Sequence, residues 1–419
     1  MKRLVPFTAA AAAATLAVAG VAVAQPSTSI TTVLGGLNNP RSLAVDGSGS
    51  LYVTQAGPYG GSDPFHATRT ESGDTTGSLS KIRRPGTSRQ QTAWSTPFPG
   101  VWTNENGSPE VLGASGVSVR SGECEEHGRA ARRCDVRVLT SESKPGYLVD
   151  HPGVTPPALG TLSSVNRRTG AATELSNVGQ QMWDWTNAHT SLAPLDFPDS
   201  NPYGVLVTRS RSRAGARTFV VDAGANTVSE VAANGTATVI AYIPNDPTRD
   251  STPTCVAEGP DRALYVGTLD MFQNGFGPPT PGSGPGNSSI WRIDPTANGN
   301  FLTAAQKWAT GFTTITSCTF DRSGNLWATE MFTNDVVRVS FRNPTSQKRY
   351  GDKTTMPLPG GIAPAGEKGV YVSINSLTTT PGTGAVVRLR VRGSEHPEKS
   401  HTSGGDHSPA PTAAPRTHD

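Results

Sequence analysis

A short strand-like segment recurs six times along the chain, and this repeat constrains the fold more than any other feature. Each copy begins with small or polar residues and carries an aliphatic residue at its third and sixth positions. Successive copies end 46 to 83 residues apart, which is the spacing of propeller blades with loop insertions. The six copies are "GSLSKI" (77–82), "GTLSSV" (160–165), "NTVSEV" (226–231), "SSIWRI" (288–293), "NDVVRV" (334–339) and "GAVVRL" (384–389).

A second phrase precedes several of these copies and consists of a turn followed by large or β-branched residues. It reads "GSLYV" from Gly49, "RALYV" from Arg262, "GNLWA" from Gly324 and "KGVYV" from Lys368. Strands with apolar groups on both faces are buried between two layers. With an inner strand such as "RSLAVD" (41–46) and an outer one such as "TATVIAYI" (236–243), four antiparallel strands make a blade. The sequence therefore predicts an all-β fold, a six-bladed β-propeller of four-stranded antiparallel blades.

The last blade lacks an outer strand, because the sequence after "GAVVRLRV" contains no further strand pattern. The segment "STSITTVL" (27–34) near the N-terminus could supply it, and this closure would leave no open sheet edge between the first and last blades. We expect Ile30–Leu34 to lie beside Val386–Val391 as the outer strand.

The chain has 419 residues, with 46 glycines, 34 prolines and 16% charged residues, which suits many short strands joined by turns. Residues 1–24 have a basic start, an apolar stretch and an Ala22-Val23-Ala24 ending. This pattern predicts a signal peptide cut after Ala24, with an uncleaved membrane anchor as the alternative. We expect a secreted or periplasmic protein whose mature chain has no membrane span, with the propeller over 25–395.

Residues 396–419 are rich in Pro, Ser, Thr and Gly and predict a disordered tail. The tail holds four of the eight histidines, whose spacing fits no tight metal site. Without Lys2 and Arg3 the chain has 36 − 2 = 34 basic and 33 acidic groups. This near-balance of charge does not indicate a nucleic-acid-binding protein. The basic stretch 209–217 is interpreted as a solvated hairpin tip, with a polyanion contact as the alternative.

Six longer segments carry a further signal: "DSNPYGVLV" (199–207), "VVDAGANTVSEV" (220–231), "PTCVAEGPDRALYVG" (253–267), "IWRIDP" (290–295), "ATGFTTI" (309–315) and "GTGAVVRL" (382–389). Together they resemble the ScyD/ScyE family of secreted NHL-like propeller proteins. The resemblance covers nearly all of the mature chain up to the tail, and implies an exported six-bladed propeller. The sequence departs from the family in the "ECEEHGRAARRC" hairpin (123–134) and the "MWDWTNAHT" linker (182–190).

Polar residues are concentrated in the third blade. Asp199 and Asn201 precede one predicted strand, and Asp222 and Asn226 follow the next, so a hairpin brings them toward one end of the blade. Carboxylate and amide oxygens are calcium ligands, and the cluster predicts a ligand site with Asp199 and Asp222 as metal ligands. The alternative is that these residues form turns by bonding their own backbone.

Glu330 and Asn334 occupy the related position of the fifth blade and extend the predicted ligand site.

Catalytic motifs are absent: the chain has no Gly-x-Ser-x-Gly elbow at a strand–helix turn and no HExxH. The histidines His66, His127, His151 and His189 are not repeated in register, which disfavours a histidine metal centre. Trp183 and Trp185 are interpreted as filling a gap between blades, with a carbohydrate platform as the alternative.

The four cysteines predict two disulfides in an exported chain. Cys124 and Cys134 flank one hairpin tip and should pair with each other. Cys255 lies nine residues before Leu264, and Cys318 lies eight before Leu326 (264 − 255 and 326 − 318). The two side chains therefore point to opposite faces of equivalent inner strands, and opposite faces meet between adjacent blades. We predict a bridge between blades four and five.

Two functions follow from this sequence. The first is a non-enzymatic scaffold, expected to be a monomer, that binds an unknown small molecule or protein. The alternative is a metal-dependent hydrolase or lyase with a divalent ion in the central channel, by analogy of fold with lactonases and streptogramin lyases. Calcium is the one cofactor that the polar cluster suggests, and we name no catalytic residue.

Overall fold

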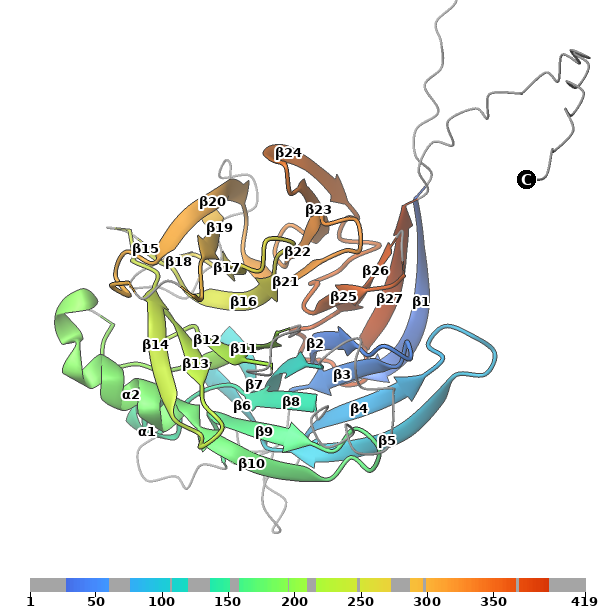
Figure 1. Cartoon of the computed structure of the whole chain (residues 1–419). Helices are drawn as coiled ribbons and strands as arrows, with labels where there is room; N and C mark the ends of the chain where they lie inside the picture. Colours follow the sequence, from blue (N-terminus) through green and yellow to red (C-terminus); the bar gives the residue numbers. More distant parts are fainter. Residues whose placement is uncertain are drawn as a thin grey trace, which may run out of the picture. The chain divides into compact units, whose positions relative to one another are not determined.

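Six antiparallel sheets of four or five strands, together with one two-stranded sheet, make up the part of the chain that the structure describes. The computed structural model describes residues 28–391, except for 60–75, 106–107, 120–135, 151–157, 195, 209–215, 247–248, 273–286, 297–298 and 367–368 (Figure 1). The predicted signal peptide and tail lie outside the described residues.

Each of the six larger sheets is one predicted blade. Blade one contains β2 (Pro40–Val45), β3 (Leu51–Gln55), β4 (Gly77–Arg83) and β5 (Gln91–Phe98). Blade two contains β6 (Gly100–Glu105), β7 (Ser108–Ser118), β8 (Val136–Thr140), β9 (Thr161–Val165) and β10 (Ala172–Asn177). Blade three contains β11 (Pro202–Val207), β12 (Thr218–Asp222), β13 (Thr227–Val231) and β14 (Ala237–Tyr242).

The remaining blades follow the same order. Blade four contains β16 (Pro253–Glu258), β17 (Leu264–Thr268), β19 (Ser288–Ile293) and β20 (Ala305–Phe312). Blade five contains β21 (Ile315–Phe320), β22 (Leu326–Glu330), β23 (Asp335–Ser340) and β24 (Asn343–Tyr350). Blade six contains β25 (Ile362–Pro364), β26 (Gly369–Ile374), β27 (Gly384–Val391) and β1 (Thr28–Leu37).

The inner strands contact one another in a closed cycle. Strand β2 contacts β7, and β11, β16, β21 and β25 follow in turn until β25 contacts β2 again (Figure 1). Strand β1 is the neighbour of β27 in the last sheet. The predicted closure of the sixth blade by the N-terminal strand is therefore confirmed, and the fold is a six-bladed β-propeller.

The repeated segments are the third strands of the blades, and their aliphatic third residues are all buried. These residues are Leu79, Leu162, Val228, Ile290, Val336 and Val386. In the second strand of blade one, Leu51 and Val53 pack in a cluster with blade six, whereas Tyr52 packs in a cluster with blade two. This alternation follows from the pleat, and each such burial contributes about 1.5–3 kcal/mol.

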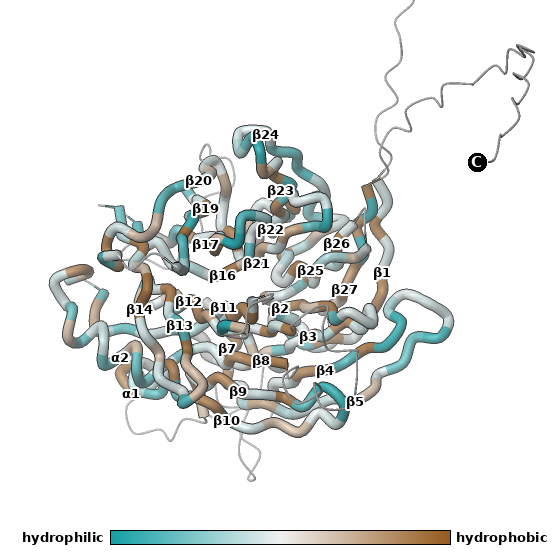
Figure 2. The backbone as a smooth tube through the Cα atoms, viewed as in Figure 1, coloured by the Kyte–Doolittle hydropathy of each residue, from teal (hydrophilic) through white to brown (hydrophobic). Residues whose placement is uncertain are grey.

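Hydrophobic residues are concentrated toward the inner strands, and the outer strands β5 and β24 carry hydrophilic stretches (Figure 2). This gradient is what blades packed face to face require, because only their outermost edges meet water.

Two additions to the blades were not predicted from the sequence. Strand β7 pairs with β8 over its second half and with β6 over its first half, so a β6–β7 hairpin extends blade two beyond the ring of inner strands. The second addition is the short sheet of β15 (Arg249–Asp250) and β18 (Met271–Phe272).

The segment interpreted as a linker is helical, and this corrects the sequence interpretation. Helices α1 (Lys144–Asp150) and α2 (Val178–Ala188) contact each other, and α2 also contacts β9 and β14. The side chain of Asn177 caps α2 by accepting a hydrogen bond from the backbone of Gln180. No helix of the described residues is long and apolar enough to cross a membrane.

Candidate functional site: the central channel

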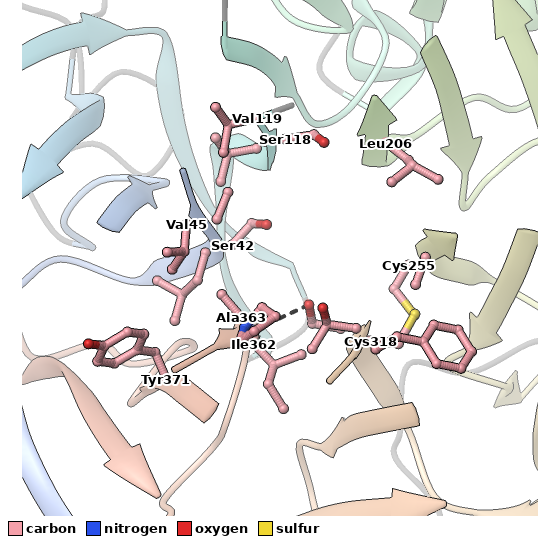
Figure 3. Close-up of a pocket in the computed structure, with 18 of the residues that line it drawn as sticks. Ser42, Val45, Ser118, Val119, Leu206, Cys255, Cys318, Ile362, Ala363 and Tyr371 are labelled. Carbon is pink, nitrogen blue, oxygen red and sulfur yellow. Dashed lines mark hydrogen bonds between the residues drawn. A yellow bond between two sulfur atoms is a disulfide. The ribbon is translucent and has the colours of Figure 1, made fainter. Parts of the chain in front are cut away.

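A cavity of about 530 Å³ lies among the inner strands of all six blades. Most of its lining residues come from β2, β7, β11, β16, β21 and β25, so the cavity is the central channel of the propeller (Figure 3). Ligand pockets have volumes of about 300–1,000 Å³. The channel therefore has the size of a small-molecule site.

Irregular pairing near the start of the inner strands shapes one end of the channel. The register between the first and second strands shifts after the first residue of β11, β16 and β21, and within β2 and β7. A β-bulge of this kind re-aims a side chain. In β11, β16 and β21 the residues in the shifted positions are Tyr203, Thr254 and Thr316, respectively, and all three line the cavity.

Hydroxyl groups at this end join neighbouring blades. Thr254 Oγ1 donates to the carbonyl of Ile315 at 2.6 Å, and Thr316 Oγ1 donates to the carbonyl of Pro359 at 3.0 Å. These bonds satisfy buried backbone oxygens and fix the starts of adjacent inner strands relative to each other.

The middle of the channel has aliphatic and hydroxyl walls. Figure 3 shows Ser42, Val45, Leu206 and Ile362 around the central space. The Ile362 backbone N–H donates to Ser317 Oγ at 3.3 Å, which links β25 to β21. This part of the wall can accommodate an apolar body and a few hydrogen bonds.

A disulfide between Cys255 and Cys318 forms part of the wall and joins blades four and five (Figure 3). The Cα atoms are 5.7 Å apart, within the range that a bridge allows. The predicted bridge between these cysteines is confirmed. The predicted Cys124–Cys134 pair lies outside the described residues.

Charged lining residues lie near the two ends of the channel. Arg41 lies at the end where β2 starts, and its Nη2 donates to the carbonyl of Val111 at 2.7 Å. The acidic residues of the lining, within the described part of the chain, are Asp46, Glu258 and Asp321. All three lie where inner strands end.

The predicted polar cluster of blade three does not line the channel. Ser200 connects the two aspartates, because its N–H donates to Asp199 Oδ1 and its hydroxyl donates to Asp222 Oδ2, both at 2.7 Å. Asp222 is 1% exposed and also accepts hydrogen bonds from the N–H groups of Asn201 and Ala225. Burial raises the pKa of Asp222 to about 6.

The three predicted asparagines connect blades through their side-chain oxygens. Asn201 Oδ1 accepts from the N–H of Glu142 at 2.9 Å. Asn226 and Asn334 have left-handed backbone, with φ of 55° and 62°, a conformation that asparagine tolerates well. Their Oδ1 atoms accept from the N–H groups of Thr252 and Leu358, respectively.

Glu330 in blade five also accepts hydrogen bonds through its side-chain oxygens. Its Oε1 accepts a hydrogen bond from the N–H of Thr313, and its Oε2 accepts one from Arg349 Nε at 3.0 Å. Burial and the neighbouring Asp335 carboxylate raise the pKa of Glu330. None of the six predicted ligand residues lines the channel.

These contacts favour the turn-forming interpretation of the cluster over the metal site. An ion at Asp222 would have to displace hydrogen bonds that both carboxylate oxygens already accept. Within the described residues, no group of three or more His, Cys, Asp and Glu side chains has an arrangement that could hold a metal ion. Calcium binding by Asp199 and Asp222 stays a prediction.

The remaining candidates lie away from the channel or outside the described residues. Trp185 stacks on His189 and packs against Phe301 beside helix α2, and Trp183 lies next to Gly146 near α1. Three of the histidines considered (His66, His127 and His151), the four of the tail (His396, His401, His407 and His418) and nearly all of the basic stretch 209–217 lie outside the described residues.

The sequence interpretation missed Arg41 and Glu142. When the inner strands are aligned by their second residues, β2 has Arg41 where β11, β16 and β21 have uncharged residues. This difference is the sequence signal that could have identified Arg41. No local sequence pattern distinguishes Glu142 from other glutamates. Its backbone has a left-handed conformation, with φ of 63°. Burial and the Asp199 carboxylate raise its pKa well above the usual range.

No protein-family model and no curated protein matches the chain. Among solved structures, a streptogramin B lyase is 13% identical, with a TM-score of 0.45 over 87% of this chain and 98% of the other. A gluconolactonase from Xanthomonas campestris is 13% identical, with a TM-score of 0.43 over 86% and 89%. A protein of unknown function from Bacteroides thetaiotaomicron is 12% identical, with a TM-score of 0.49 over 88% and 77%. This chain is similar to them in fold.

Proposed function

We propose that this chain is an exported propeller of the ScyD/ScyE type that acts as a non-enzymatic scaffold and binds a small molecule in its central channel. The observation that carries the proposal is the cavity of about 530 Å³ among the six inner strands. The motifs that resemble the family also form this scaffold, since "DSNPYGVLV" runs into β11 and "PTCVAEGPDRALYVG" spans β16 and β17.

The wall chemistry supports binding of a molecule that has both apolar and hydrogen-bonding groups. Val45, Leu206 and Ile362 provide aliphatic groups, whereas Ser42, Thr319 and other serines and threonines of the lining provide hydroxyls. Small-molecule sites combine apolar walls with polar groups that orient the ligand, and the lining of this channel has both.

Catalysis by a channel metal is supported less well. Such a centre requires several oxygen ligands around one ion. Of the described acidic lining residues, Asp46 already accepts hydrogen bonds from Ser48, Ser50 and Tyr52, and Asp321 accepts them from Asn325 and Trp327.

The test is binding of an uncharged fluorescent probe, N-phenyl-1-naphthylamine, to the purified mature chain. We expect a saturable increase in fluorescence with one probe per chain. Leu206→Trp should weaken probe binding at least tenfold by filling the channel. Leu175→Trp is the matched control, because Leu175 is exposed on the outer strand β10, and it should leave binding unchanged.

A second channel variant, Val45→Phe, covers the case in which Leu206→Trp does not fold. Equal probe binding by the wild type and a folded channel variant would contradict the proposal. The hydrolase or lyase alternative is tested by a screen of lactones and esters with and without calcium. Turnover that depends on calcium and is lost in Leu206→Trp but not in Leu175→Trp would replace the scaffold by an enzyme.

A further inference from the structure

Arg41 is a buried cation at the end of the channel where the inner strands start. The residue is 8% exposed and lines the cavity. A guanidinium has five N–H donors and stays charged inside proteins. Buried arginines are nearly always paired, because moving a charge out of water is costly.

The charge of Arg41 has no protein counter-ion among the described residues. Its one side-chain hydrogen bond joins Nη2 to the uncharged carbonyl oxygen of Val111. The nearest acidic lining residue along the same strand, Asp46, is five residues away, about 16 Å at about 3.3 Å per residue. Asp46 is also bonded to neighbouring hydroxyls and lies 3.5 Å from Lys81 Nζ.

The other guanidinium nitrogens remain accessible. Neither Nε nor Nη1 of Arg41 has a partner in the described part of the chain, yet neither is among the fully buried side-chain atoms without a partner. Arg41 lines the channel, and we take these N–H groups as the donors that a bound molecule would meet.

A purely structural role accounts for only part of this arrangement. The bond to Val111 ties the β6–β7 hairpin to blade one, but a neutral amide donor could make the same bond. The positive charge is not needed for it. The arrangement suits an anion that accepts from the remaining N–H groups, and guanidinium matches the planar geometry of a carboxylate.

We infer that the channel binds an amphipathic monocarboxylate, with its carboxylate on Arg41 and its apolar body along Val45, Leu206 and Ile362 toward the other end. This inference rests on the proposed function and names the ligand class for the same channel. The distance of about 16 Å between the positions of Arg41 and Asp46 sets the length of body that the channel can hold.

The test uses decanoate and its methyl ester as displacers of N-phenyl-1-naphthylamine from the mature chain at pH 7.5. The two compounds share the apolar body and differ in charge. We expect decanoate to bind at least tenfold more tightly than the ester, because a charge-assisted pair adds to the apolar contacts.

Arg41→Gln should reduce decanoate affinity at least tenfold and leave the ester unaffected, and Arg41→Lys should restore part of the difference. Arg322→Gln is the matched control, since it removes the same charge from the exposed residue at the other end of the channel. Its decanoate affinity should stay within twofold of the wild type.

Equal affinities of decanoate and ester, unchanged by Arg41→Gln, would overturn the carboxylate inference while leaving the channel as a binding site. Failure of the wild type to bind even the fluorescent probe would overturn the proposed function as well. A loss of thermal stability in Arg41→Gln with unchanged decanoate affinity would show that Arg41 serves the hairpin alone.

Discussion

Removing the disulfide between Cys255 and Cys318 should destabilise the propeller by about 4 kcal/mol. The bridge joins residues 63 positions apart, and closing a loop of this length removes about 4 kcal/mol of chain entropy from the unfolded state. Both half-cystines lie in the channel wall between β16 and β21. The bridge therefore also fixes the distance between two inner strands.

The assay is urea unfolding followed by tryptophan fluorescence. The parent protein carries Cys124→Ala and Cys134→Ala, so that reductant acts on the channel bridge alone. Comparing the oxidised with the reduced parent isolates the covalent link, because no other atom changes. Cys255→Ala with Cys318→Ala should lose slightly more, since it also removes two buried sulfur atoms.

A reduced parent within about 1 kcal/mol of the oxidised parent would refute the entropic argument. Free thiols at both positions in exported protein, found by non-reducing peptide mapping, would refute the bridge itself. A change in probe affinity on reduction would show in addition that the bridge sets the width of the channel.

Two further predictions concern the polar contacts between blades. Asp222→Asn should lower the free energy of unfolding by about 1–3 kcal/mol, because one carboxylate oxygen that accepts hydrogen bonds is lost. The decrease should be the same in the presence of calcium and in the presence of EDTA. If calcium instead raised the melting temperature of the wild type but not that of this variant, the result would support the predicted metal site. Because burial and Asp335 raise the pKa of Glu330, folding favours its protonated form, and stability should fall as pH rises from about 5 to about 8. Glu330→Gln should flatten that fall in urea titrations, and an unchanged slope would contradict the assignment.

The blades could be predicted because their second and third strands repeat a pattern with a direct physical cause. Leu51 and Tyr52 must be apolar on opposite faces, since each faces a different neighbouring blade. The N-terminal strand could be predicted because a ring closes only when every blade is complete. The β6–β7 hairpin and helix α2 each occur once in the described chain, and no repeat in the sequence predicts them.

The cysteine pairing was predictable for the same reason. The one-residue difference in the positions of Cys255 and Cys318 places them on opposite faces of equivalent strands, and the pleat then directs them toward each other. The predicted Cys124–Cys134 pair offers no comparable register, because neither cysteine belongs to a repeated segment of the sequence.

The role of the polar cluster could not be read from the sequence. An aspartate at the end of a strand looks the same whether it faces an ion or a backbone N–H group. Asn201 accepts from the N–H of Glu142, 59 residues earlier in the chain, and only the packing of two blades creates that contact. Arg41 was missed likewise, since its partner Val111 lies 70 residues away in an unpredicted hairpin.

Some polar groups bond between blades and others line the channel, so variants of the two kinds should differ in their effects on stability and on ligand affinity. Asp222 and Asn334 bond backbone groups that set where inner strands begin, so their replacement should lower stability and, by moving the strands, weaken binding of charged and uncharged ligands alike. Arg41 has N–H groups without a protein partner, so its replacement should act on carboxylates selectively. If replacement of Asp222 or Asn334 reduced decanoate affinity and left ester affinity unchanged, as expected for Arg41→Gln, those blade contacts and not Arg41 would account for the preference for a carboxylate.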